Sequence, residues 1–240
     1  MKIATWNIRS GGGRRLPAIA ERILAEDASL MLLTEFRTEP GRRLLELLAL
    51  GDRHHVLATE PPKNANGLLA LSTTPFEHAQ CPIVPPASCH RWLRFRLPVW
   101  DLEVLGVHVP NMGEPWNKAE YWDCLLRFAE WAKDRRALVL GDFNTGLPAD
   151  TQGAPFHLGD RMQRLIDLGW IDTWRAVHGE HTEYTWLSPN AGNGFRLDHC
   201  FVSPALAGDV ERVAFGHDVR LNGLSDHSLL SIRLGITAAN

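Results

Sequence analysis

The segment ALVLGDFN, residues 137–144, constrains the fold more than any other stretch of the sequence. Its four leading apolar residues are typical of a strand covered on both faces, which requires layers of structure on either side. Asp142 and Asn144 follow at alternate positions, so pleating can direct both side chains to one spot. Gly141 permits a close approach of the backbone there. Gly-Asp-x-Asn is also ordinary turn chemistry, so this segment alone does not predict a site.

Strand-length apolar runs alternate with amphipathic stretches along the chain. Residues 16–28 and 118–134 carry apolar side chains at helical spacing, whereas residues 91–97 and 101–111 have the length and pattern of strands. No linker or repeat separates the two halves, so we expect one domain over residues 1–240. A mixed chain with this many strands predicts an α/β fold of the α+β type, with helices outside two central sheets.

The charge balance limits the partners that the chain can bind. Its net charge is -3 and its pI is near 6.4, which argues against a protein that coats nucleic acid by charge alone. Local basic clusters can still steer a polyanion, and they occur at residues 14–15, 42–43 and 91–96.

The cysteines and the apolar runs predict a compartment. The four cysteines show no CxxC spacing, which is typical of reduced thiols in a cytoplasmic protein. The N-terminus lacks the apolar core of a signal peptide, and no run approaches the length of a membrane span. We therefore expect a cytoplasmic protein that does not act at a membrane.

Polar residues follow one apolar strand after another. Each alone also fits a structural role, but together they predict a site where strand ends meet. The set comprises Asn7, Glu35, His108, Asn111, Asp142, Asn144, Asp198, Asp226 and His227. Its oxygen donors favour Mg²⁺ or Mn²⁺ over zinc. A carboxylate such as Asp198 can orient His227 and favour its charged form. These are the components of phosphoester hydrolysis.

Six motifs in this order resemble the endonuclease/exonuclease/phosphatase superfamily: TWNIR, LTEFR, GVHVPN, GDFN, FRLDHCFVS and SDHS. The similarity extends over nearly the whole chain. It implies a four-layer sandwich of two packed mixed β-sheets flanked by α-helices. It also implies phosphoester hydrolysis with Mg²⁺ or Mn²⁺ as the cofactor.

The resemblance further implies roles for individual residues of this sequence. Asn7 and Glu35 would bind the metal, with Asp226 close by. Asp142 and Asn144 would hold and activate the attacking water.

By the same resemblance, His227 would contact the scissile phosphate and would be oriented by Asp198. Asn111 would touch a phosphate oxygen. His108, on the GVHVPN strand, is a further catalytic candidate.

Within the superfamily, the chain is most similar to the exonuclease III and abasic-endonuclease branch. The run LGWIDTWRAVHGEHTEYTWLSPNAGNGFRLDHCFVS resembles that branch's segment through its abasic-sugar pocket. Trp186, Phe195 and Leu197 would form the apolar wall, which can accept a flipped, base-less sugar. These three side chains also fit a purely structural place in the core. Arg9 and Arg37, which close the first two motifs, are candidate substrate-binding residues.

We therefore expect a monomeric DNA nuclease without an obligate protein partner, acting on duplex DNA at abasic sites or 3′ ends. A small phosphodiester, a lipid head-group phosphoester or RNA is the alternative substrate. His108 favours that alternative, because the abasic-endonuclease branch usually carries tyrosine there, and so does the acidic balance. A non-catalytic binding module ranks last, because every part of the expected centre is present.

Overall fold

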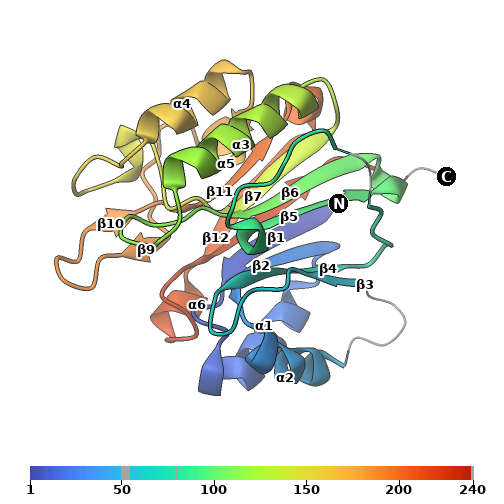
Figure 1. Ribbon diagram of the computed structural model, residues 1–240, viewed down its shortest axis with the longest axis vertical. Coiled ribbons are helices and arrows are strands. Elements are labelled where there is room, and N and C mark those ends of the chain that lie inside the picture. Colours follow the sequence, from blue (N-terminus) through green and yellow to red (C-terminus); the bar gives the residue numbers. More distant parts are fainter. Residues whose placement is uncertain (50–54, 79–80, 239–240) are drawn as a thin grey trace.

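The computed structural model describes residues 1–49, 55–78 and 81–238, which contain two β-sheets packed face to face (Figure 1). One sheet has six strands in the spatial order β12 (Val210–Gly216), β13 (Leu229–Leu234), β1 (Lys2–Asn7), β2 (Leu30–Phe36), β4 (Gly67–Ser72) and β3 (His55–Ala58). The other has five, in the order β5 (Trp92–Leu97), β6 (Leu102–His108), β7 (Ala137–Asp142), β11 (Asp198–Val202) and β8 (Ile171–Asp172). Both sheets are mixed, because β1 runs parallel to β2 and β6 parallel to β7 among antiparallel neighbours.

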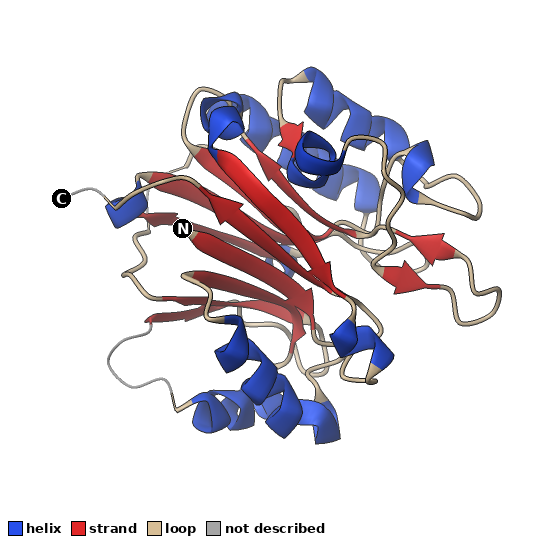
Figure 2. Ribbon diagram, turned by 180° about the vertical axis from the view of Figure 1, so that it is seen from behind, coloured by secondary structure: helices blue, strands red, loops and turns tan. Residues whose placement is uncertain are grey.

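Helices cover the outer face of each sheet, which gives four layers (Figures 1 and 2). On the six-stranded sheet lie α1 (Leu16–Glu26) and α2 (Thr38–Leu48). On the five-stranded sheet lie α3 (Lys118–Ala132) and α4 (Gly159–Asp167). Two short helices complete the fold: α5 (Thr173–His178) packs against β11 and β12, and α6 (Asp218–Leu221) precedes β13. This arrangement confirms the expected sandwich.

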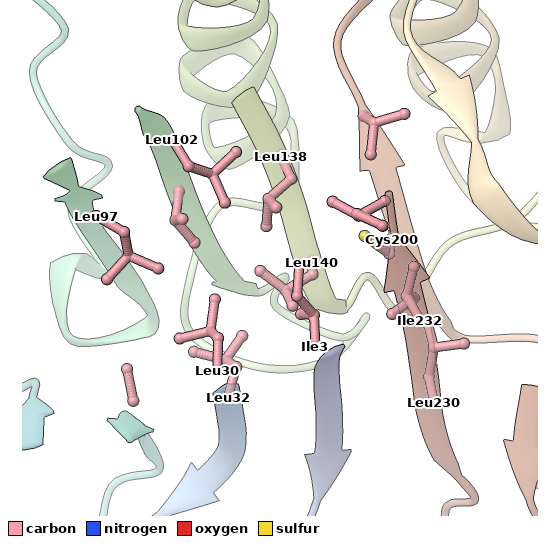
Figure 3. Packing of buried hydrophobic residues seen from close by; sticks show 14 of the residues in the cluster. Ile3, Leu30, Leu32, Leu97, Leu102, Leu138, Leu140, Cys200, Leu230 and Ile232 are labelled. Atoms are coloured by element: carbon pink, nitrogen blue, oxygen red, sulfur yellow. The ribbon is translucent and has the colours of Figure 1, made fainter. Parts of the chain in front are cut away.

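The β7 strand is buried on both faces, as its apolar run predicts. Leu138 and Leu140 belong to the core between the sheets, whereas Ala137 and Val139 face the helical layer. Figure 3 shows Leu140 beside Ile3 of the opposite sheet. Burial of each leucine stabilises the fold by about 1.5–3 kcal/mol. The strand that delivers Asp142 is therefore one of the most firmly held in the molecule.

The predicted apolar stripe on α3 is also confirmed. Tyr121, Leu125, Phe128 and Ala132 are fully buried against the five-stranded sheet. Asn117 caps the start of this helix, where its side chain accepts hydrogen bonds from two backbone N–H groups. Such a cap stabilises a helix by about 1 kcal/mol.

Gly141 allows a close approach of the backbone, as expected, and the partner is a neighbouring strand. It lies within β7 with φ 137°, and a Cβ there would sit 2.0 Å from the carbonyl oxygen of Val107. The close approach is therefore to the neighbouring strand β6, not to a bound molecule. The glycine still matters to the site, because it sets the distance between the strand ends that carry His108 and Asp142.

Strand pairing gathers the predicted polar residues at one rim of the sandwich. Asp142 pairs with His108 on one side and with Asp198 on the other, and Asn7 ends β1 in the facing sheet. The hairpin of β9 (Trp186–Leu187) and β10 (Gly194–Phe195) lies at this rim with α6, away from the N-terminus (Figure 1).

Two observations bear on the expected compartment. In the described ranges, no helix has both the length and the apolar character needed to cross a membrane. All four cysteines lie in those ranges, and each is a free thiol.

Candidate active site

A cavity of about 460 Å³ opens at the rim where the strand ends meet. It is lined by seven of the predicted polar residues and by all three predicted apolar wall residues: Glu35, His108, Asn111, Asp142, Asn144, Asp226, His227, Trp186, Phe195 and Leu197. Asn7 and Asp198 lie behind this lining and hold it through hydrogen bonds. The structure therefore brings the predicted centre and the predicted wall into one space.

Asp142, the last residue of β7, lies at the middle of the polar cluster. Its Oδ2 accepts a hydrogen bond from Asn7 Nδ2 at 2.9 Å, and its Oδ1 accepts one from the backbone N–H of Asn144 at 2.9 Å. Asn7 Nδ2 also donates to Glu35 Oε1 at 3.1 Å, so one amide joins two carboxylates. Burial raises the pKa of Asp142 to about 7, against the opposing effect of His227. A carboxylate with this pKa is suited to accept a proton near neutral pH.

Glu35 is directed into the cavity by an irregularity of β2. The pairing of β2 with β4 shifts register between Thr34 and Phe36, and Glu35 takes a left-handed backbone with φ 58°. Such bulges and positive φ values re-aim side chains and persist only where the surroundings hold them. The backbone N–H of Ser10 donates to Glu35 Oε2 at 2.6 Å. Burial alone would raise the pKa of Glu35, but His108 and the hydrogen bonds from Ser10 and Asn7 lower it below its usual value.

His227 is a buried cation held by Asp198. Its Nδ1–H donates to Asp198 Oδ2 at 2.8 Å, and its Nε2 lies 3.9 Å from Asp142 Oδ2. Burial alone would lower the pKa of His227, but the charges of Asp198 and Asp142 raise it to about 10. The bond to Asp198 fixes the ring orientation, so Nε2–H faces the cavity as a donor. This is the arrangement that the sequence predicted for these two residues.

Asn144 is oriented by the backbone around it. Its Nδ2 donates to the carbonyl of Val109 at 2.9 Å, which leaves Oδ1 as an acceptor, and the residue has a left-handed backbone with φ 44°. Because Asn144 also donates its backbone N–H to Asp142, the two side chains are held relative to each other. The pair can therefore accept hydrogen bonds from one small molecule such as water.

His108 lies on the opposite side of Asp142 from His227. Its Nε2 is 3.9 Å from Asp142 Oδ2, and its buried Nδ1 has no hydrogen-bond partner among the described residues. Burial and the nearby Arg91 lower the pKa of His108 to about 4, so the ring is neutral at pH 7. The two histidines that flank Asp142 thus differ in charge.

The loop that carries Asn111 is anchored by an ion pair that the sequence analysis missed. Arg91 binds Glu114 through two hydrogen bonds of 2.8 and 2.7 Å, and Glu114 Oε2 accepts the backbone N–H of Asn111 at 2.8 Å. A two-pronged arginine–carboxylate contact is strong and directional. No sequence pattern joins these positions, because the partners are 23 residues apart.

The apolar wall is an aromatic cluster. The ring centroids of Trp186 and Phe195 are 5.7 Å apart, and Phe156, which was not predicted, lies 5.7 Å from Phe195. Both distances are favourable for aromatic contact. Trp186 also forms a backbone bridge with His227, and Ser228 N–H donates to the carbonyl of Thr185 at 2.9 Å. The apolar wall and His227 are therefore joined by one piece of backbone.

Arg9 and Arg37, predicted to bind substrate, do not line the cavity. Arg9 Nε lies 3.7 Å from Asp226 Oδ2, and 61% of its side chain is exposed. Arg37 Nε donates to Asn66 Oδ1 at 2.7 Å. Their role in substrate binding stays a prediction.

A second buried polar cluster, here called the arginine network, lies behind the apolar wall. It consists of Asp150, Asp172, Arg175 and Arg196. Arg196 sits between Phe195 and Leu197 in sequence, and its side chain is fully buried. It donates to Asp172 at 2.6 and 3.1 Å and to Asp150 at 2.9 Å, and Arg175 donates to Asp150 at 2.6 Å. Every carboxylate of this network meets a guanidinium.

A larger cavity, of about 960 Å³, lies elsewhere, between residues such as Arg96, Glu103 and Trp131. Glu103 lies near the start of β6, at the far end of the strand from His108. The acidic and basic side chains of this larger cavity are largely paired with each other, as Arg96 is with Glu77 and Asp101. We therefore place the chemistry in the smaller cavity.

The donor set of the rim cavity fits a hard divalent cation. Glu35 and Asp226 offer carboxylate oxygens to the cavity, and Asn7 offers an amide oxygen behind them. The tightest group of acidic and histidine ligand atoms is Asp142, Asp198 and His227, all within 4.8 Å of one another. Two members of that group already share a hydrogen bond, so it suits proton and phosphate contact better than metal binding.

Comparison with known proteins agrees with this geometry. The model of the Endonuclease/Exonuclease/phosphatase family matches residues 4–227. The chain is 31% identical over 157 residues to Recombination repair protein 1 of Drosophila melanogaster, a stretch that covers 55% of this chain and 22% of that protein. The chain thus spans about a fifth of the length of that relative.

Solved structures share the whole fold. The 3′-5′ exonuclease NExo from Neisseria meningitidis has a TM-score of 0.81 and 26% identity, and a structure of the 3′ phosphatase NExo from Neisseria with a product DNA hairpin has 0.80 and 25%. In both cases 98% of this chain and 99% of the other are covered. An AP endonuclease from Archaeoglobus fulgidus has a TM-score of 0.81 at 20% identity with the same coverage, and that likeness shows the fold. The chain belongs to the Endonuclease/Exonuclease/phosphatase family, and it is a phosphoester hydrolase.

Proposed function

We propose that this protein is a Mg²⁺- or Mn²⁺-dependent DNA nuclease that hydrolyses phosphoester bonds at 3′ ends or abasic sites. The single observation that carries the proposal is the shared cavity, in which the aromatic wall adjoins the centre formed by Asp142 and His227. The Neisseria structures, named as a 3′ phosphatase and a 3′-5′ exonuclease, and the Drosophila repair protein support DNA as the substrate.

Asn7, Glu35 and Asp226 would hold the metal ion. When bound, such an ion polarises the phosphate and offsets its charge. Glu35 and Asp226 present oxygens to the cavity, and Asn7 is hydrogen-bonded to Glu35.

Asp142 and Asn144 would hold and activate the attacking water. The water oxygen bonds to phosphorus while its proton passes to Asp142, whose pKa of about 7 suits this exchange. The P–O bond to the leaving oxygen then breaks. Asn144 Oδ1 accepts the second water proton as a hydrogen bond and so fixes the direction of attack.

His227 would donate a hydrogen bond to a phosphate oxygen. Its charge is held by Asp198 in a water-poor site, where it stabilises the negative charge that develops on the phosphate. Asn111 and His108 line the same space, and Asn111 offers its side-chain amide to a second oxygen.

The aromatic wall would select the sugar. Trp186, Phe195 and Phe156 enclose an apolar space beside the centre, which suits a terminal or base-less deoxyribose more than a nucleotide still stacked in a duplex. We expect the protein to bind DNA as a monomer. The cytoplasmic location stays a prediction.

A small phosphoester or RNA is the second candidate substrate. The observation that favours it is His108, a neutral ring in place of the tyrosine usual in the abasic-endonuclease branch, together with the net charge of -3.

Labelled duplexes test the proposal. One carries an abasic-site analogue, one a 3′-phosphate and one neither, and each is incubated with Mg²⁺ or with EDTA. We expect Mg²⁺-dependent cleavage at the analogue, release of the 3′-phosphate, or stepwise loss from the 3′ end. The Asp142→Asn variant serves as the matched control. If bis(p-nitrophenyl) phosphate is hydrolysed but no duplex is, the mechanism stands and DNA is the wrong substrate.

A further inference from the structure

Lys118 is a buried lysine in the wall of the rim cavity that neither the sequence analysis nor the proposed mechanism uses. It is the first residue of α3 and only 6% exposed, and it lines the cavity together with Asp142 and Asn144. Its Nζ donates to the backbone carbonyl of Asn144 at 2.6 Å. The ammonium group is thus fixed beside the residue that holds the attacking water.

Asp142 and Glu114 favour the charged form of Lys118 from beyond ion-pair distance, but their effect does not offset that of its burial. Lysine is rarely buried unless it is paired, yet among the described residues Lys118 has no carboxylate within 4.0 Å. It also stands at the N-terminus of a helix, where the backbone already contributes partial positive charge. Burial lowers the pKa of Lys118 to about 8, so the fold bears a cost for its charged form.

The composition of the cavity shows what could offset this cost. Its acidic lining residues are Glu35, Glu114, Asp142 and Asp226. Lys118 is the one lysine or arginine among the described lining residues. Since the Asn144 carbonyl takes one of its three N–H donors, two remain for a ligand.

We propose that Lys118 binds the phosphate group on which the site acts. This inference rests on the proposed function and adds a phosphate ligand to it. The Asn144 carbonyl keeps Nζ in place, so the lysine side chain loses little freedom when phosphate arrives. A phosphate oxygen supplies an anionic partner in direct contact, which none of the described carboxylates does, and the contact is a charge-assisted hydrogen bond.

Inorganic phosphate is the probe, because it requires no assumption about DNA. The chain has four lysines, Lys2, Lys63, Lys118 and Lys133, so protein labelled with ¹³C-lysine gives few side-chain Cε signals. Phosphate is titrated in the presence of Mg²⁺, and the Lys118→Met variant assigns the signal. We expect the Lys118 signal to shift and saturate while the other three stay fixed.

Inhibition provides the second readout. The inhibition constant of phosphate is measured against hydrolysis of bis(p-nitrophenyl) phosphate by the wild type, Lys118→Met, Lys118→Arg and Lys133→Met. Lys133 is an exposed lysine at the end of the same helix, paired with Glu130, so Lys133→Met is the matched control. We expect Lys118→Met to raise the constant about tenfold or more, Lys118→Arg to stay within about threefold, and Lys133→Met to match the wild type.

Two results would overturn the inference. One is an unshifted Lys118 signal at phosphate concentrations that inhibit the wild type, or no phosphate binding at all. The other is a Lys118→Met variant with a lower kcat but an unchanged inhibition constant, which would limit the lysine to holding the Asn144 backbone. If the wild type cleaves no DNA, the proposed function fails, whereas the phosphate readouts still decide the role of Lys118.

Discussion

The rim cavity and the arginine network are both buried polar clusters next to β11, but their carboxylates are paired with cations in different ways. In the network, two carboxylates share two guanidinium groups at hydrogen-bond distance. In the cavity, the side chains of His108 and His227 each lie 3.9 Å from Asp142, and only His227 is charged. The network is satisfied within the chain, whereas the cavity has acids that a bound cation can satisfy. This difference is the one expected between a cluster that stabilises the fold and a cluster suited to bind a ligand.

The pKa values of the aspartates also differ between the two clusters. Burial alone would raise the pKa of both Asp172 and Asp142. Arg196 reverses the effect at Asp172 and lowers its pKa, but at Asp142 the effect of burial prevails and the pKa reaches about 7. One residue type therefore serves as a permanent charge in one cluster and as a proton acceptor in the other.

The largest effect is expected from Asp142→Asn. The substitution keeps the shape of the side chain and removes the proton acceptor, so kcat falls by about 1000-fold or more. Steady-state hydrolysis of the DNA substrate and thermal unfolding are measured on the same preparation. The melting temperature should change little compared with kcat, because the amide keeps the shape of the side chain and one oxygen acceptor. Activity near the wild-type level would remove Asp142 from the mechanism.

The opposite pattern is expected from Arg196→Met. Removal of the guanidinium leaves Asp150 and Asp172 buried without their shared partner, which destabilises the fold by about 3–5 kcal/mol. Denaturant unfolding measures the loss. Arg43→Met, which breaks an exposed pair with Glu46, is the control and should cost within about 1 kcal/mol. A loss from Arg196→Met as small as that of the control would show that the network does not hold the wall.

A change of pH should alter the stability contributions of the two clusters in opposite directions. A carboxyl whose pKa is lower in the folded than in the unfolded protein stabilises the fold above pH about 4, and this contribution is lost as the pH falls. Asp172 is such a group. The Asp172→Asn variant should therefore lose less stability than the wild type between pH about 5 and 3. Parallel curves would contradict this assignment.

Asp142 should act in the opposite direction in protein kept metal-free with EDTA. Its pKa of about 7 means that, between pH about 4 and 6, the unfolded chain releases a proton that the folded chain keeps. The contribution of Asp142 to stability should therefore fall as the pH rises through this window, whereas His108, whose pKa is lowered to about 4, contributes with the opposite sign. His227 does not interfere there, because it is charged in both states. Unfolding curves of the wild type and Asp142→Asn should diverge as the pH rises.

The smallest effect is expected from metal binding. Mg²⁺ at about ten times its dissociation constant should stabilise the wild type by about 1.4 kcal/mol, which raises the melting temperature by a few degrees. Glu35→Gln should abolish this shift. Asp172→Asn should keep it, because the network takes no part in metal binding. A shift that survives in Glu35→Gln would place the ion elsewhere.

The layers and the polar strand ends could be predicted from sequence because both follow from local patterns. Apolar runs mark β7 and α3, and polar residues end β1, β6 and β7. Their meeting at one rim follows from parallel pairing, which the sheets show for β1 with β2 and for β6 with β7. The sequence therefore predicts that Asp142 and His227 meet at this rim, and the structure places them 3.9 Å apart there.

Other contributors could not be predicted, because nothing local marks them. Lys118 stands at the start of a helix, where its side chain could equally point to solvent. Phe156 comes from the irregular segment after Asp150. The partners of Arg196 lie 46 and 24 residues away, so the network exists only in the folded chain. The sequence predicts a close backbone approach at Gly141, but it does not show that Val107 is the residue approached.

The backbone bridge between Trp186 and His227 has a consequence for how the protein can diversify. The bridge fixes the base of the β9–β10 hairpin to the reactive histidine, whereas residues 189–192 at the tip are exposed. Lengthening, shortening or replacing the tip changes what the hairpin touches on an incoming molecule and leaves the bridged base in place. The tip of the hairpin can therefore vary while its base stays fixed, so changes at the tip can alter specificity without moving His227.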